Sequence, residues 1–342
     1  MKNSEIRVGL LAYGAIGDEH NQAVSAADGL VVTAVCDTNP ERIAAALKIA
    51  PSAKTFTDAD LMLKSGEIDL VIISTPPNSH YSWAKSALSL GLHVILEKPM
   101  ALTSDQCDEL MALAKKSNLL LVVYQNRRFD ADFLTIKSAI DQGLIGDLFS
   151  FESFVGGYSK PCDFWHSDAQ VSGGAIFDWG SHFIDQILAI VPDEIEFVSG
   201  VNQKRVWDHI TNADHAQVSI NFKGGVQATF INSDLAAARK PKFYLLGTKG
   251  ALVGNWDESG GGAVADRSAI ISLHQPDGSS KVLPPVMAAP YAFHKSVANY
   301  LHNQVKMDVQ AGQSRDVVAI MQAAELSALS NGLPVTPKLL HR

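Results

Sequence analysis

The sequence predicts an α/β protein in which a doubly wound parallel sheet precedes an α+β domain with a mostly antiparallel, open sheet. Up to about residue 125, short and almost continuously apolar runs alternate with helical patterns, and a glycine-containing turn follows the first run. After residue 150 the segments instead alternate apolar and polar residues. We therefore expect an N-terminal Rossmann domain over 1–125 and a second domain over 126–342.

The apolar runs of the first part have the length of buried strands. They lie at 5–11, 31–36, 69–73, 92–96 and 119–123. Helical patterns occupy 16–27, 40–50, 58–64, 79–90 and 103–117. The last of these opens with Thr103 and Gln106 in the spacing of a capping box.

The second part alternates in the manner of strands that bury one face. Such segments lie at 148–156, 195–204, 214–222, 226–233, 242–247 and 269–274. Helical patterns at 130–142, 174–190, 291–306 and 315–331 are expected to cover one face of the resulting sheet. The partly apolar opposite face favours a homodimer or homotetramer.

Composition excludes several classes of function. The 342 residues carry a formal net charge of −8, which is unlike a protein that binds nucleic acid or an anionic membrane surface. No apolar run approaches the length of a membrane span, and the first residues lack the pattern of a secretory signal, so a cytoplasmic location is expected. A small-molecule ligand fits this composition best.

The turn after the first strand is close to a dinucleotide-binding fingerprint. In the stretch GLLAYGAIGDEH, Gly14 and Gly17 occupy the second and third glycine places of G-x-G-x-x-G, and Ala12 occupies the first. Alanine is acceptable there if its φ is negative, which is what we expect. The turn residues Ala12, Gly14, Ala15 and Ile16 are therefore candidates for contact with a pyrophosphate.

Asp37 supports the same interpretation. It ends the second strand 20 positions after Gly17, where a carboxylate meets the hydroxyls of an adenosine ribose. No arginine follows it directly to neutralise a 2′-phosphate, although Arg42 lies on the next helix, so NAD is favoured over NADP. A cap for the loop before Pro40 is the alternative role for Asp37.

Two further strand ends carry polar residues. The carboxyl ends of parallel strands form the edge at which open α/β sheets bind ligands. The candidates after the third and fourth strands are Ser74, Thr75, Pro76, Asn78, His80, Glu97 and Lys98.

Together these motifs resemble the Gfo/Idh/MocA family of glucose-fructose oxidoreductase and inositol dehydrogenase-like proteins. Its members carry the glycine turn, an E-K-P motif, here Glu97 to Pro99, and G-G-x-x-x-D-x-x-x-H, here GGAIFDWGSH from Gly173 to His182. The stretches NRRF at 126–129 and GLIGDL at 143–148 also look like family signatures, so the resemblance covers essentially the whole chain. Ala12 departs from the family pattern.

The resemblance implies an NAD(P)-dependent oxidoreductase that acts on a secondary hydroxyl of a polyol, inositol or sugar. It implies that Lys98 or His182 transfers the proton and that Asp178 orients the site. Asp178 and His182 are four residues apart, so a helix places them on one face. The same spacing also suits a solvated helix pair, and we expect no metal, because no third ligand lies at a helpful spacing.

Residues near these motifs are further candidates. Trp165 and His166 could stack on a sugar ring and donate to it, or belong to a surface loop. Asn126 is a candidate for substrate contact, whereas Arg127 and Arg128 are expected to pair structurally.

Two other functions remain open at this point. One is a glycosidase that uses tightly bound NAD for transient oxidation, which would release no NADH. The other is a dinucleotide-sensing regulator without turnover, although such a protein is expected to lack Lys98 or His182, and both are present.

Overall fold

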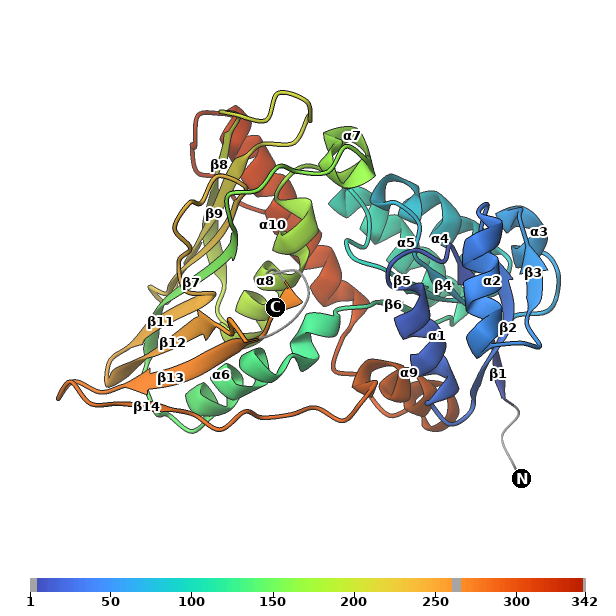
Figure 1. Cartoon of the computed structure of the whole chain (residues 1–342), viewed down its shortest axis with the longest axis horizontal. Coiled ribbons are helices and arrows are strands. Elements are labelled where there is room, and N and C mark those ends of the chain that lie inside the picture. Colours follow the sequence, from blue (N-terminus) through green and yellow to red (C-terminus); the bar gives the residue numbers. More distant parts are fainter. Residues whose placement is uncertain (1–4, 260–265, 341–342) are drawn as a thin grey trace. The chain divides into compact units, whose positions relative to one another are not determined.

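The computed structural model describes residues 5–259 and 266–340, and the chain divides into two compact units (Figure 1). Unit 1 comprises residues 1–125 together with 289–315, and unit 2 comprises residues 126–288 together with 316–342. The expectation that the helix near 291–306 covers the antiparallel sheet is wrong, because this segment returns to unit 1. Periodicity shows that a helix buries one of its faces, but it does not show which sheet that face packs against.

Unit 1 is built on a parallel sheet with the strand order β3-β2-β1-β4-β5-β6. Its strands are β1 (Ile6–Leu11), β2 (Leu30–Cys36), β3 (Lys54–Phe56), β4 (Leu70–Ile73), β5 (His93–Leu96) and β6 (Leu121–Val123). Its helices are α1 (Gly17–Ser25), α2 (Pro40–Ile49), η1 (Pro77–Ser79, a 3-10 turn), α3 (Ala59–Leu63), α4 (His80–Ser89), α5 (Ser104–Ser117) and α9 (Ala292–Asn303). The predicted doubly wound sheet is confirmed.

Burial explains why the central strands were recognisable and one edge strand was not. All four residues of β4 are buried, as expected of a parallel strand covered on both faces. In contrast, β3 is a three-residue edge strand whose Lys54 and Thr55 are exposed, so it shows no apolar run and was missed. The predicted cap at Thr103 is present, since its Oγ1 accepts the N–H of Gln106 at 3.2 Å.

Unit 2 contains a mixed sheet with the order β14-β13-β12-β11-β7-β10-β9-β8. Its strands are β7 (Leu148–Gly156), β8 (Ile195–Gln203), β9 (His215–Phe222), β10 (Gln227–Ser233), β11 (Phe243–Gly247), β12 (Gly250–Trp256), β13 (Ala269–His274) and β14 (Ser280–Val282). Of the strand pairings, β7 with β10 is parallel and the others are antiparallel. The predicted mostly antiparallel sheet is therefore confirmed.

Two strands of unit 2 were not predicted. β12 carries glycine at 250 and 254, and glycine weakens the strand pattern. Gly254 is required by packing, because a Cβ there would press on the side chains of Phe243 and Ile271 in the neighbouring strands. β14 has three exposed residues and so gives no apolar signal.

Helices cover one face of this sheet. The helical segments of this part of the chain are η2 (Asn126–Phe129, 3-10), α6 (Ala131–Asp141), η3 (Trp165–Ser167, 3-10), α7 (Ala169–Ser172), α8 (Phe177–Ile190) and α10 (Ala311–Leu329), which begins in unit 1 and continues into unit 2. Figure 1 shows α6, α8 and α10 on the same side of the strands. α10 approaches β8 closely at Gly200, where a Cβ would collide with the carbonyl of Ala324.

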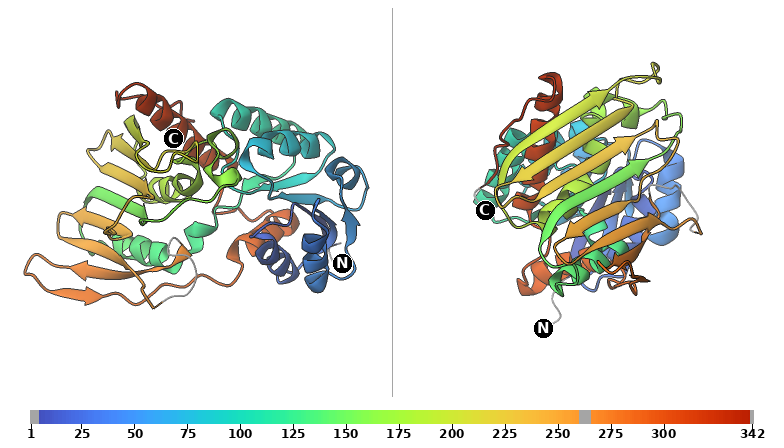
Figure 2. Two further views of the ribbon diagram at one scale, coloured as in Figure 1. Left: turned by 45° about the horizontal axis from the view of Figure 1, so that its top comes forward. Right: turned by 90° about the vertical axis from the view of Figure 1, so that its left-hand side faces the viewer.

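The opposite face of the sheet is partly apolar and faces the viewer in the right-hand view of Figure 2. Val201 on β8, Tyr244 on β11 and Ile270 on β13 are exposed there. This face is the candidate contact for the expected homodimer or homotetramer, which stays a prediction. Among the helices of the described residues, none is long and apolar enough to cross a membrane.

A buried ion pair connects α6 to the sheet in unit 2. Nζ of Lys242 lies 2.7 Å from Oδ2 of Asp132, and both side chains are less than 5% exposed (4% and 0%). Lys242 also donates to the carbonyl of Arg267 (3.0 Å), and the N–H of Ala269 donates to Asp132 (2.8 Å). The charges therefore satisfy each other in a region from which water is excluded.

Replacing Lys242 tests this pair. Lys242→Met leaves the Asp132 carboxylate buried without its cation, so we expect the free energy of unfolding to fall by about 3–5 kcal/mol in urea titrations. The control is Lys240→Met, since Lys240 is 55% exposed and lies 3.3 Å from Glu152. That exposed pair is worth about 1 kcal/mol or less. Equal losses in the two variants would contradict the prediction.

Candidate functional site

The predicted cofactor residues of unit 1 lie where neighbouring parallel strands end. The N–H of Ser74, after β4, donates to the carbonyl of Leu11 at the end of β1 (2.9 Å). The N–H of Glu97, after β5, donates in the same way to Ile73 at the end of β4 (3.0 Å). The turns after β1, β4 and β5 are therefore adjacent, at the point where the strand order reverses between β1 and β4.

The glycine turn contains a strained residue. Ala12 has φ +67°, in the left-handed region, so the expectation of a negative φ is wrong. The alanine adopts the conformation for which glycine is usually selected, because the turn is held from both sides. The N–H of Ala12 donates to the carbonyl of Cys36 (2.9 Å), and that of Tyr13 to Oδ2 of Asp37 (2.7 Å).

Tyr13 explains the glycine that begins α1. Its ring is buried beneath the turn, and a Cβ at Gly17 would collide with it. The Tyr13 hydroxyl donates to Asp18 (2.7 Å) and accepts from Asn21 (3.1 Å), and burial raises its pKa to about 12. Gly14, Ala15 and Ile16 remain partly or fully accessible on the outside of the turn.

Asp37 holds the turn and the following loop together. Its Oδ2 accepts the N–H of Tyr13, and its Oδ1 accepts the N–H of Asn39 (2.8 Å), the residue that caps α2. Asp37 therefore also has the alternative role that the sequence allowed, because it caps the loop before Pro40. A carboxylate has further lone pairs, so these bonds leave acceptor capacity for a ribose hydroxyl. Nη1 of Arg42, an exposed residue, lies 3.7 Å from Oδ2.

The turn after β4 contains Ser74, Thr75 and Pro76, followed by Asn78 in η1. Asn78 is exposed, but His80 is completely buried. The two ring nitrogens of His80 lie 2.7 Å from the carbonyl oxygen of Pro99 and 2.8 Å from that of Thr75. Burial lowers the pKa of His80. The His80 side chain therefore joins two turns, and its contact with a cofactor stays a prediction.

The E-K-P turn follows β5. The backbone N–H of Lys98 donates to Oε2 of Glu97 (3.2 Å), and the Lys98–Pro99 peptide bond is cis. Oε1 of Glu97 lies 2.9 Å from Nε2 of His20 on α1. Glu97 thus supports the turn from inside, while Lys98 is partly accessible.

In unit 2 the second motif begins α8. Gly173 and Gly174 have φ +93° and +113°, which explains the two consecutive glycines before the helix. Asp178 lies in the first turn of α8 and His182 one turn later, so they share a face as predicted. His182 is buried and Asp178 is partly exposed.

A further carboxyl group near Asp178 was not predicted. Asp234 follows β10, and burial raises its pKa to about 6. The charge of Asp214 raises it further, Lys204 opposes this, and Asp178 adds to the increase. Asp234 was missed because only the folded sheet brings the end of β10 close to α8.

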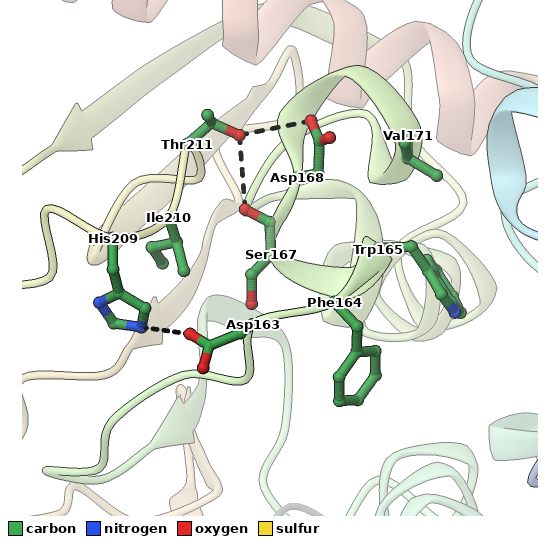
Figure 3. A pocket seen from close by; sticks show the side chains of 9 residues that line it. All are labelled: Asp163, Phe164, Trp165, Ser167, Asp168, Val171, His209, Ile210 and Thr211. Atoms are coloured by element: carbon green, nitrogen blue, oxygen red, sulfur yellow. Dashed lines mark hydrogen bonds and ion pairs between the residues drawn. The ribbon is translucent and has the colours of Figure 1, made fainter.

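Trp165 and His166 lie on the loop before α7. Their rings are stacked with centroids 3.5 Å apart, and Trp165 is partly exposed rather than buried. Trp165 lines an open pocket of about 400 Å³ (Figure 3), which is bordered by Asp163, Phe164, Trp165, Ser167, Asp168, Val171, His209, Ile210 and Thr211. Figure 3 shows the Asp163–His209 pair (3.3 Å) opposite Trp165.

The residues of the NRRF stretch form η2. Arg128 makes two bonds to the carboxylate of Asp185 on α8 (2.5 and 2.6 Å). Arg127 pairs with Asp130 (3.2 Å) and Asp266 (2.5 Å). The predicted structural pairing of both arginines is confirmed, whereas substrate contact by Asn126 stays a prediction.

No group of three or more histidine, cysteine, aspartate or glutamate side chains that could hold a metal ion occurs within residues 5–259 and 266–340.

Two family models match the chain. Residues 6–125 match the model described as oxidoreductase family, NAD-binding Rossmann fold, and residues 133–253 match the Gfo/Idh/MocA C-terminal domain. The chain belongs to the Gfo/Idh/MocA family. Its N-terminal part is therefore an NAD(P)-binding Rossmann fold, and the family is one of oxidoreductases.

Similar proteins agree with this membership. An NAD-binding protein from Listeria innocua has a TM-score of 0.85 and 30% identity, covering 98% of this chain and 97% of its own. The scyllo-inositol 2-dehydrogenase (NADP(+)) IolW of Bacillus subtilis is 24% identical over 341 residues, 94% of each chain. The myo-inositol 2-dehydrogenase of Thermotoga maritima is 25% identical over 283 residues, 81% of each.

The strain at Ala12 predicts a stabilising substitution. Ala12→Gly removes a Cβ from a left-handed residue, so we expect the free energy of unfolding to increase by about 1 kcal/mol, measured by urea titration. Ala26 is a matched control, because it is exposed and has φ −93°. Ala26→Gly should lower stability slightly. A loss of stability in Ala12→Gly would show that the turn is not strained.

The raised pKa of Asp234 predicts a pH dependence. The folded protein keeps this proton up to about pH 6, whereas the unfolded chain loses it near pH 4, so stability decreases as the pH rises between these values. Asp234→Asn should remove this part of the decrease, which urea titrations from pH 4 to pH 7 would detect. The control is Asp277→Asn. Hydrogen bonds from Ser279 lower the pKa of Asp277, so this carboxyl group titrates below the pH range in which Asp234 changes stability. Parallel curves for Asp234→Asn and the unmodified protein would contradict the prediction.

Proposed function

We propose that this protein is an NAD(P)-dependent dehydrogenase that oxidises a secondary hydroxyl group of a polyol, inositol or sugar, or reduces the corresponding ketone. The observation that carries the proposal is the presence of the family's lysine and of its Asp–His pair. Lys98 follows β5 beside the cofactor turns, and Asp178 and His182 share one face of α8. Relatives named as inositol dehydrogenases support the substrate class.

The residues of unit 1 fit a dinucleotide. The accessible turn at Gly14 to Ile16 precedes α1, whose N-terminal N–H groups favour a pyrophosphate. Asp37 keeps acceptor capacity for the ribose hydroxyls, and a carboxylate repels a 2′-phosphate, so we infer NAD as the preferred cofactor. The nearby guanidinium of Arg42 is the group that would reduce this preference.

Each remaining residue has an assigned task. A nicotinamide cofactor, when bound by unit 1, would supply the hydride acceptor. Lys98 or His182 takes the hydroxyl proton during oxidation or returns it during reduction. Asp178 orients the hydroxyl, and Trp165 with His166 contacts the substrate ring. The carboxyl groups of Asp178 and Asp234 favour a neutral substrate over an anionic sugar acid, because like charges repel.

The proposal is tested with a panel of inositols, aldoses, sugar acids and simple glycosides, each with NAD and with NADP. Appearance of free reduced nicotinamide in the absorbance supports a dehydrogenase, whereas glycoside cleavage without its release would indicate the NAD-dependent glycosidase. Tight NAD binding with neither reaction would indicate a dinucleotide sensor.

On a substrate from the panel, Lys98→Met should lower kcat by about 100-fold or more, since it removes a proton-transfer group but keeps most of the side-chain volume. NAD affinity, measured by calorimetry, should stay within a few fold. The control is Lys85→Met, because Lys85 is an exposed lysine on α4 that pairs with Glu109 (3.2 Å). A normal kcat in Lys98→Met would show that Lys98 is structural.

A further inference from the structure

The returning segment of the chain places a buried histidine next to α1 within unit 1. His294 lies in α9 and is completely buried, although it belongs to neither of the stretches that match the family models. Its Nε2 lies 3.0 Å from Nδ1 of His20, which is 1% exposed. The other ring nitrogen of His20 lies 2.9 Å from Oε1 of Glu97.

These contacts form a continuous hydrogen-bonded series that ends at the backbone of Lys98. Oε2 of Glu97, the oxygen that does not face His20, accepts the N–H of Lys98 at 3.2 Å. The series therefore runs from α9 through α1 to the turn that carries the proposed proton-transfer lysine. All of its members belong to unit 1.

Hydrogen-bond chemistry assigns the protons along the series. The carboxyl oxygen of Glu97 accepts, so the proton of neutral His20 is on Nε2 and its Nδ1 carries a lone pair. That lone pair accepts from His294, whose proton is then also on Nε2. Nδ1 of His294 is left as a buried acceptor, and it has no hydrogen-bond partner among the described residues.

The surroundings keep His294 neutral. Burial, together with the nearby His20, lowers its pKa well below the usual value. The ring of Tyr124 lies against both histidines, with centroids 4.6 Å from His20 and 5.1 Å from His294. The Tyr124 hydroxyl donates a hydrogen bond to the carboxyl group of Glu19 (2.5 Å).

We propose that His294 and His20 are positioning residues that orient the carboxyl group of Glu97 and, through it, the backbone of Lys98. The proposal deepens the dehydrogenase function and rests on it, since it assumes that Lys98 acts in proton transfer. Two buried imidazoles cost desolvation energy that an apolar pair would avoid. The directed hydrogen bonds from His294 to His20 and from His20 to Glu97 in the E-K-P turn supply a reason for this cost.

Two variants of equal size test the proposal. In His294→Gln the side-chain amide replaces the Nε2 donor, whereas His294→Met fills a similar volume without any donor. We expect kcat to fall about tenfold in His294→Met and to stay within about twofold in His294→Gln, because a small displacement of a catalytic group is costly. KM for cofactor and substrate should change little in both variants.

A second histidine of α9 serves as the control for a variant that only weakens the packing of this helix against the rest of unit 1. Nε2 of His302 lies 3.1 Å from the carbonyl of Gly29, before β2. His302→Met should lower thermal stability without lowering kcat. If it lowers kcat as much as His294→Met does, or if His294→Gln is as slow as His294→Met, the positioning role is overturned.

Imidazole ¹⁵N NMR separates this proposal from the dehydrogenase function. Both histidines should show the Nε2–H tautomer, and His294 should stay neutral between about pH 5 and 8. The Nδ1 signal of His20 should move toward that of an unbonded acceptor nitrogen in His294→Met and stay close to its original position in His294→Gln, whereas the Nε2–H tautomer, which the contact with Glu97 fixes, should be kept in both variants. If the unmodified protein oxidises no compound in the panel but these signals are found, the dehydrogenase function fails while the hydrogen-bonded series stands. If the His20 signals are the same in both variants, the series itself is overturned.

Discussion

Parallel pairing between β1 and β4 is the constraint on which the rest of unit 1 depends. Strands that run in one direction end at one edge, and the hydrogen bonds of Ser74 and Glu97 continue the ladder past the strands. Polar turns separated by dozens of residues in sequence are therefore adjacent. The reversal of strand order at this point leaves space above the β1 and β4 ends, where a dinucleotide binds in folds of this kind.

Side chains buried beneath these turns determine their conformation. Asp37 accepts two backbone N–H groups, His80 joins the turns after β4 and β5, and His20 supports Glu97. The glycine turn is held by the bonds of Ala12 to Cys36 and of Tyr13 to Asp37, and it therefore tolerates an alanine with positive φ at position 12. The groups available to a ligand are thus carried on a framework of buried polar contacts.

Unit 2 applies similar principles to a different sheet. Helix α8 begins after two glycines with positive φ, which start it where Asp178 and His182 share a face. The end of β10 then brings Asp234 close enough for its charge to interact with that of Asp178. The buried pair of Lys242 and Asp132 holds α6 against the same sheet. Carboxyl groups in such surroundings suit the recognition of hydroxyl groups, which donate hydrogen bonds to them.

Apart from the edge strand β3 and helix α9, the sequence by itself determined the order of strands and helices in the Rossmann unit. It also determined the glycine turn, the E-K-P motif and the helix of Asp178 and His182, because these depend on local spacing and periodicity. Tertiary structure decided the φ of Ala12, the burial of His80, the raised pKa of Asp234 and the contact of His294 with His20. Each of these follows from segments that are distant in sequence. The helix near residue 292 illustrates the physical reason: its periodicity shows that it buries one face, but only the folded chain determines which residues that face meets.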